Sequence, residues 1–148
     1  EPYNTLVLLS NDEFFLNRIE AHIMTNQFDL ANAELQYFIG TRTEGYDPDS
    51  DIVTEELIRD QYPAIENEFT PFYGLTPKQA SYIKAIADVR KRDFIHEGLR
   101  WFDIRRFDLK ITHYSFTAPP NILQKGDNRR VLQIPLAASN QGIEKNPR

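Results

Sequence analysis

The chain has 148 residues and a formal net charge of −5, with 41% hydrophobic and 26% charged residues. This composition is typical of a globular domain with its own core, and it excludes a wholly disordered chain. An acidic chain lacks the basic footprint of a nucleic-acid-binding protein, so we expect no nucleic-acid partner. Cysteine is absent, which excludes disulfides, thiol catalysis and zinc–thiolate sites. The sequence contains no run of 18 apolar residues, so no membrane-spanning helix is predicted.

Residues 10–40 predict two helices that pack as an antiparallel hairpin. Ser10 and Glu13 have the spacing of a capping box, and apolar residues at helical steps predict a first helix over residues 11–25. A second helix is expected with Asp29 as its cap and Gly40 at its end. The inward residues predicted for this second helix are Leu30, Ala33, Tyr37 and Phe38. So short a turn makes the pair antiparallel, like one tetratricopeptide unit, which needs a neighbour to cover it.

Residues 41–75 form an irregular segment that is rich in aromatic side chains, with one short helix predicted over residues 54–60. Tyr46, Tyr62 and Tyr73 are the candidate ligand contacts, because the apolar face of a sugar packs on an aromatic ring while its hydroxyls find polar partners. The alternative is that such rings only cover the helix pair. For Phe69 and Phe72 we expect burial.

Three alternating acids, Asp47, Asp49 and Asp51, resemble the first ligands of a calcium loop. Ile52 stands at the sixth position, where the EF-hand has Gly, and Ile58 stands at the twelfth, where it has Glu. The EF-hand pattern therefore fails, which leaves a looser calcium site or a solvated acidic turn. No two histidines have metal-ligand spacing, and we expect neither a transition metal nor a cofactor.

Residues 76–108 contain the strongest helix signal. Thr76 as cap, Pro77 at the first helical position and Gln79 as the closing residue of a capping box start a helix that is expected to run to about Glu97. One stripe of this helix, continued into the next segment, comprises Ile83, Ile86, Arg90, Phe94, Glu97 and Trp101.

Charges of both signs are interspersed between residues 88 and 108. A nucleic-acid-binding helix would carry one sign, whereas this pattern indicates an internal ion-pair network that fixes two helical segments. Direct ligand binding is the alternative. The predicted members of the network are Arg90, Arg92, Glu97, Arg100, Asp103 and Arg106.

After residue 110 the pattern changes to β-branched and aromatic residues. Strands are predicted at residues 111–116 and 130–134, paired as an antiparallel ribbon, with a loop at 118–121 and an irregular tail to residue 148. The expected fold class is mainly α (α+β), in one unit: a tetratricopeptide-like hairpin at 10–40, the irregular segment at 41–75, the helices of 76–108, and a small C-terminal β ribbon with its tail at 111–148.

The segment from Arg90 to Arg106 resembles the C-terminal signature of the SusD/RagB family. That family shows Arg-x-Arg-Glu-Leu, then Glu-Gly-x-Arg-Trp-Phe-Asp-Leu and a basic residue. This chain has Arg-Lys-Arg-Asp-Phe, then Glu97-Gly98-Leu-Arg-Trp-Phe-Asp-Ile-Arg. Gln-Ile-Pro at 133–135 and Asn-Pro at 146–147 follow in the order that the family shows, and the helix hairpin resembles its last tetratricopeptide-like unit.

The resemblance implies a nutrient-binding lipoprotein on the cell surface of a Bacteroidetes-type outer membrane. Such proteins cover a TonB-dependent (SusC-like) transporter and pass it glycans or peptides without catalysis. Because family members are several times longer, we expect this chain to be a C-terminal portion, with the lipid anchor elsewhere. The signature itself is expected to be a folding element rather than a ligand site.

The expected function is therefore non-catalytic capture of a glycan at the cell surface, together with the transporter. One alternative is a helical-repeat module that binds only protein. A second is a glycoside hydrolase, because its paired carboxylates could come from any of the 22 acidic residues of the chain.

Overall fold

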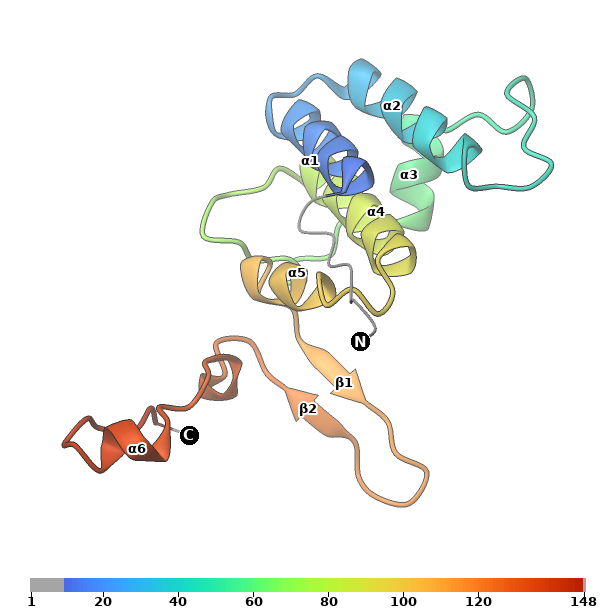
Figure 1. The fold of residues 1–148 in the computed structure, drawn as a ribbon. Helices are drawn as coiled ribbons and strands as arrows, with labels where there is room; N and C mark the ends of the chain where they lie inside the picture. Colours follow the sequence, from blue (N-terminus) through green and yellow to red (C-terminus); the bar gives the residue numbers. More distant parts are fainter. Residues whose placement is uncertain (1–9, 148) are drawn as a thin grey trace, which may run out of the picture.

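The computed structural model describes residues 10–147, and within them the chain is mainly α-helical with one small antiparallel sheet (Figure 1), as predicted. The elements in chain order are α1 (Asn11–Met24), α2 (Phe28–Gly40), α3 (Glu55–Gln61), α4 (Pro77–Asp93), α5 (Arg100–Arg106), β1 (Ile111–His113), β2 (Asn121–Leu123), the 3₁₀ turn η1 (Asn128–Arg130) and α6 (Leu136–Ser139).

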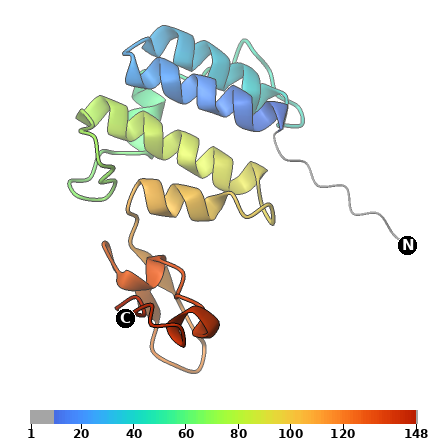
Figure 2. The same cartoon turned by 60° about the vertical axis from the view of Figure 1, so that its left-hand side comes forward.

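The helices are stacked in layers, with the ribbon at one end. In Figure 2, α1 lies between α2 and α4, α5 lies beyond α4, and the β1–β2 ribbon lies beyond α5. The hairpin of α1 and α2 is thus confirmed, and α4 supplies the neighbour that covers it. The core between these helices consists mainly of Leu16, Ile19, Ile23, Ala31, Leu35, Phe38, Tyr82, Ile83 and Ile86.

The predicted helix starts are confirmed at three caps. The Ser10 hydroxyl accepts from the Glu13 backbone N–H at 3.0 Å, which is one half of the predicted capping box, and the Thr54 side chain caps α3 in the same way. At α4, Thr76 and Gln79 form the reciprocal capping box, with Pro77 in the first turn. Each cap satisfies a backbone donor that the first helical turn leaves without a partner.

The prediction for the second helix is wrong in its start and its inward face. Residue 27, not Asp29, stands at the cap position of α2, and its side chain makes no capping hydrogen bond. Of the four residues expected inside, only Phe38 is buried; Leu30 and Tyr37 are 50% and 65% exposed, and Ala33 is exposed too. The face that meets α1 is Ala31, Leu35 and Phe38, because those positions share one side of the helix.

Helix α4 ends at Asp93, four residues before the predicted end. The chain turns away from the helix axis through two residues of left-handed backbone, His96 at φ 68° and Gly98 at φ 80°. Glu97 and Trp101 therefore leave the predicted stripe and are exposed. The rest of the stripe is buried as predicted: Ile83, Ile86, Arg90 and Phe94.

The predicted ribbon exists, but its first strand ends at His113, three residues before the predicted end, and its second strand is not where it was expected. Ile111–His113 pairs with Asn121–Leu123, and residues 130–134 form no strand. The reason lies at Arg130, whose buried guanidinium donates to the backbone carbonyls of Ile104, Leu109 and Gln124. These bonds hold residue 130 against the end of α5 and the start of the ribbon, where it has no strand to pair with.

Candidate functional site

Four charged side chains meet where α1, α4 and α5 touch, and we call them the buried network: Glu20, Arg90, Asp103 and Arg106. Arg106 donates two hydrogen bonds of 2.7 Å to the Glu20 carboxylate and one of 3.0 Å to Asp103. Arg90 lies 3.4 Å from Asp103 and 3.8 Å from Glu13, and it donates to the Asn17 amide oxygen at 3.0 Å. The network thus joins three helices.

The buried network is sealed from solvent at its centre, where Asp103 is 1% and Arg90 5% exposed. Burial by itself lowers the pKa of Arg106, but the hydrogen bonds and negative charges of Glu20 and Asp103 outweigh burial and raise it. A buried charge with this many partners holds helices in one geometry. Even the buried Arg90 Nε, which makes no hydrogen bond, lies 3.4 Å from Asp103 Oδ1 within the network. The arrangement fits a structural network better than a binding site.

Only part of the network predicted from sequence lies in this cluster. Arg90, Asp103 and Arg106 belong to it. Arg92 instead pairs with Asp88 on the surface, and Arg100 donates to the Ala87 carbonyl at 3.4 Å.

The prediction that Glu97 belongs to the ion-pair network is wrong. Glu97 is exposed and forms no ion pair within residues 10–147, because the chain has already turned away from α4. Glu20, the partner that sequence reasoning missed, lies 86 positions from Arg106. Its one signal is its place beside Leu16, Ile19 and Ile23 on the inward face of α1.

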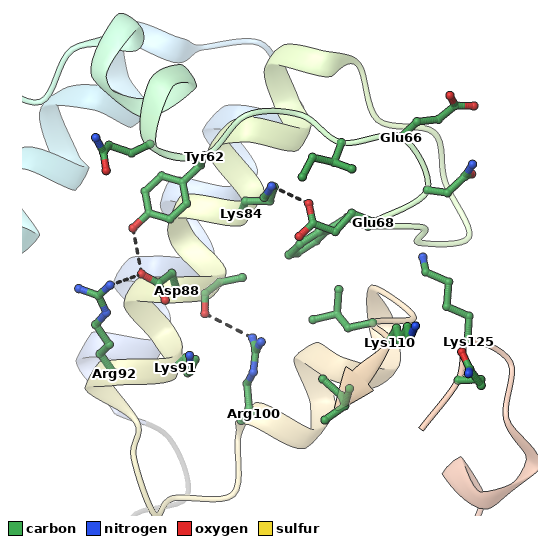
Figure 3. A pocket seen from close by; sticks show the side chains of 18 residues that line it. Tyr62, Glu66, Glu68, Lys84, Asp88, Lys91, Arg92, Arg100, Lys110 and Lys125 are labelled. Atoms are coloured by element: carbon green, nitrogen blue, oxygen red, sulfur yellow. Dashed lines mark hydrogen bonds and ion pairs between the residues drawn. The ribbon is translucent and has the colours of Figure 1, made fainter. Parts of the chain in front are cut away.

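One cavity of the described structure, separate from the buried network, is an open cleft of about 800 Å³ (Figure 3). Its walls come from residues 61–69, from α4 and Arg100, and from the segments 109–111 and 124–125 at the base of the ribbon. The lining mixes aromatic and aliphatic side chains with amides and many charges. Tyr62 is the one candidate tyrosine that lines this cleft.

Tyr62 is fixed in the cleft wall by its hydroxyl, which donates to Asp88 Oδ2 at 2.9 Å. Asp88 in turn pairs with Arg92, and Figure 3 shows the three side chains in a row along α4. Burial is the larger cause that raises the pKa of Tyr62, and the hydrogen bond to Asp88 raises it further. The Tyr62 hydroxyl therefore keeps its proton at neutral pH. A half-buried ring held in this way is a rigid surface.

The other two candidate tyrosines lie elsewhere, so the structure does not bring the three together. Tyr46 packs against Gly40 in another hollow, of about 490 Å³, beside α2. Tyr73 precedes α4 and lies within electrostatic reach of Glu20 and Arg106, and burial raises its pKa. These two rings fit the alternative in which they cover the helices.

The two phenylalanines behave differently from each other. Phe69 is partly buried and packs on Phe107 with ring centres 5.2 Å apart. Phe72 is 99% exposed, which contradicts the expectation that it is buried. Its ring contacts only the edge of Tyr73 among the ring pairs of the described residues.

The acidic turn at residues 47–51 closes on itself. The carboxylate of Asp51 accepts from the backbone N–H of Asp47, and the carboxylate of Asp47 accepts from Asp49 N–H and from the Ser50 hydroxyl. Residues 10–147 contain no group of three acids or histidines arranged to hold a metal ion. The looser calcium site weighed for Asp47, Asp49 and Asp51 thus has no support in this geometry.

Comparison with known proteins adds no relative: no protein-family model, curated protein or solved structure matches the chain. Within residues 10–147, no helix is both long enough and apolar enough to cross a lipid bilayer.

Proposed function

We propose that this chain binds an oligosaccharide in the cleft beside Tyr62 without catalysing a reaction on it. The observation that carries the proposal is the cleft itself, in which a rigid tyrosine ring stands among amide and charged side chains. Sugar binding needs a flat apolar surface for the C–H face of the ring and fixed polar groups for its hydroxyls. Tyr62 offers the first, and Gln61, Asn67 and Gln124 supply amide groups in the lining that can bond to the hydroxyls.

The wider role follows from the resemblance to the SusD/RagB family. In that role the chain is the C-terminal portion of a lipid-anchored protein on the outer membrane, and it hands a glycan to a TonB-dependent transporter. The signature around Arg90 and Asp103 serves folding, in keeping with the buried network.

The test is affinity electrophoresis of the chain through gels that contain different polysaccharides. Binding retards migration, and Tyr62→Ala is expected to abolish the retardation. Tyr62→Phe keeps the ring and loses only the hydrogen bond to Asp88, so it should retain most of the binding. Tyr114→Ala is the matched control, because Tyr114 is 87% exposed and does not line the cleft. A chain that no polysaccharide retards, or Tyr62→Ala binding as well as the wild type, would contradict the proposal.

A second candidate is a module that binds only protein, and the apolar side chains exposed on the ribbon and tail favour it. Phe116 and Leu132 are almost fully exposed, at 109% and 90%. Copurification of a β-barrel transporter without any affinity for sugar would support this candidate.

The hydrolase alternative has its own measurement. Two carboxylates of the cleft, Glu68 and Asp88, already pair with Lys84 and Arg92. Release of reducing sugar that disappears in Asp88→Asn would establish the hydrolase and overturn the binding proposal.

A further inference from the structure

The cleft carries the opposite charge to the chain that contains it. Six basic and three acidic side chains line the cleft, whereas the whole chain has a net charge of −5. The basic residues are Lys84, Lys91, Arg92, Arg100, Lys110 and Lys125, and the acidic ones are Glu66, Glu68 and Asp88.

Two of the three acids are already neutralised by neighbours in the cleft. Glu68 forms an ion pair with Lys84, and Asp88 forms one with Arg92 (Figure 3). Glu66 remains, exposed at the upper edge of the cleft in Figure 3. The negative charge available inside is therefore small.

Four of the six cations have no carboxylate within 4 Å among residues 10–147. Arg100 and Lys125 bond only to neutral oxygens, namely the Ala87 carbonyl at 3.4 Å and the Thr70 hydroxyl at 2.6 Å. Lys91 and Lys110 are exposed and form no hydrogen bond or ion pair with a described side chain. The cleft thus holds a surplus of positive charge.

The shortage of negative charge also shows at Lys125. Burial lowers the pKa of Lys125, which means that the site lacks enough negative charge to offset the loss of water around the ammonium group. An anion bound in the cleft would supply that charge. Lysine and arginine bind carboxylate and sulfate oxygens through charge-assisted hydrogen bonds, which are about twice as strong as neutral ones.

The cations are spread along the cleft instead of converging on one point. In Figure 3, Lys91 and Arg100 lie along its lower side, and Lys110 and Lys125 lie at the base of the ribbon. A ligand with a charge on successive units meets such a row better than a single small anion does.

We propose that the ligand of this cleft is an acidic oligosaccharide, whose carboxylate or sulfate groups lie along Lys91, Arg100, Lys110 and Lys125 while a sugar ring stacks on Tyr62. This inference rests on the proposed function and narrows it to one chemical class. The uncharged faces of the sugar meet Tyr62 and Ile65, and its hydroxyls meet the amides of the rim.

The experiment compares acidic polysaccharides with forms of the same polymers that have lost their charge. Polygalacturonate and alginate are paired with their carboxyl-reduced forms, and chondroitin sulfate is paired with its desulfated form, so the arms separate carboxylate from sulfate. Affinity electrophoresis and calorimetry measure binding at 50 and 500 mM salt. We expect at least one charged polymer to bind about tenfold or more tightly than its uncharged form, with the preference shrinking at high salt.

Variants of exposed lysines locate the charge. Lys91→Gln with Lys110→Gln is expected to weaken acidic binding about tenfold and to leave neutral binding unchanged. Lys145→Gln is the matched control, since Lys145 is an exposed lysine of the tail outside the cleft. Both lysines of the double variant are exposed, so the fold is expected to remain intact.

Each other outcome overturns a different statement. Equal binding of charged and uncharged forms, insensitive to salt, overturns the acidic class and leaves saccharide binding in place. Binding to no polymer of either kind overturns the proposed function. Equally tight binding of single-stranded polynucleotide, lost in the same double variant, would show that the cleft reads charge alone and would overturn the assignment to a saccharide.

Discussion

Replacing Arg90 by leucine tests the buried network most directly. The side chains of Arg90 and Asp103 are 6% and 2% exposed and lie 3.4 Å apart. The substitution leaves Asp103 buried with one cation, Arg106, whose Nε donates to it at 3.0 Å. Removing one partner from a buried pair costs about 3–5 kcal/mol, and the remaining cation places this case at the lower end, about 3 kcal/mol.

The assay is urea unfolding followed by circular dichroism. With a slope of about 2 kcal/mol per molar urea, a loss of about 3 kcal/mol lowers the midpoint by roughly 1.5 M. Glu97→Leu is the matched control in the same signature: the residue is exposed, so its midpoint should change by less than the equivalent of about 0.5 kcal/mol. The double variant Arg90→Leu with Asp103→Leu should lose less than the sum of the two single variants, since neither charge is then left alone.

A midpoint for Arg90→Leu that stays within about 0.3 M of the wild type would refute this reasoning, because a loss of only about 0.6 kcal/mol is typical of an exposed ion pair. A large loss in Glu97→Leu would refute the description of the turn after α4.

Three further predictions concern the ribbon, its 3₁₀ turn and the end of α2. Arg130→Met should leave three backbone carbonyls without their donor and release the ribbon, so that hydrogen exchange of residues 111–123 rises while α1 and α4 stay protected. The Arg129 guanidinium lowers the pKa of Asp127; its stabilising effect is complete above pH 3.8 and lost as the pH falls through the lower pKa of the folded state, and Arg129→Ala should return the carboxylate titration seen by NMR towards 3.8. Gly40→Ala places a Cβ 2.8 Å from the Tyr46 ring, so we expect no gain in stability when the substitution is made in the wild type. Made in the Tyr46→Ala variant, the same substitution should stabilise the protein by about 0.5–1 kcal/mol relative to Tyr46→Ala alone, as a double-mutant cycle in urea would show.

Local signals predicted the parts of the fold that local interactions create. The caps at Ser10 and Thr76 follow from side chains that bond to backbone groups three residues away, so their sequence spacing is sufficient. The mainly α class and the ribbon follow from the change of periodicity after residue 110.

The predictions were wrong where contacts between residues far apart in the sequence determine the local structure. Residues 130–134 have the composition of a strand, but the bonds of Arg130 to carbonyls 6 to 26 positions earlier override it. The buried face of α2 depends on where α1 and α4 lie, and amphipathic spacing alone did not specify it. Glu20 joined the buried network through a helix that sequence spacing could not place beside α5.

The candidate site was predicted in part. Tyr62 was named for its aromatic ring on an irregular segment, and it does line the cleft. The cations opposite it come from α4, from α5 and from the base of the ribbon, which are brought together only by the packing of the layers. Along the sequence these residues read as a mixture of positive and negative charges. The surplus of positive charge in the cleft is evident only once the structure shows which cations the acidic residues pair with.

The cleft lies where two parts of the molecule meet, with residues 61–69, α4 and Arg100 on one side and the segments 109–111 and 124–125 on the other. A ligand that contacts both walls stabilises their association. By reciprocity, any contact that stabilises the position of the ribbon raises the affinity of the cleft for the ligand.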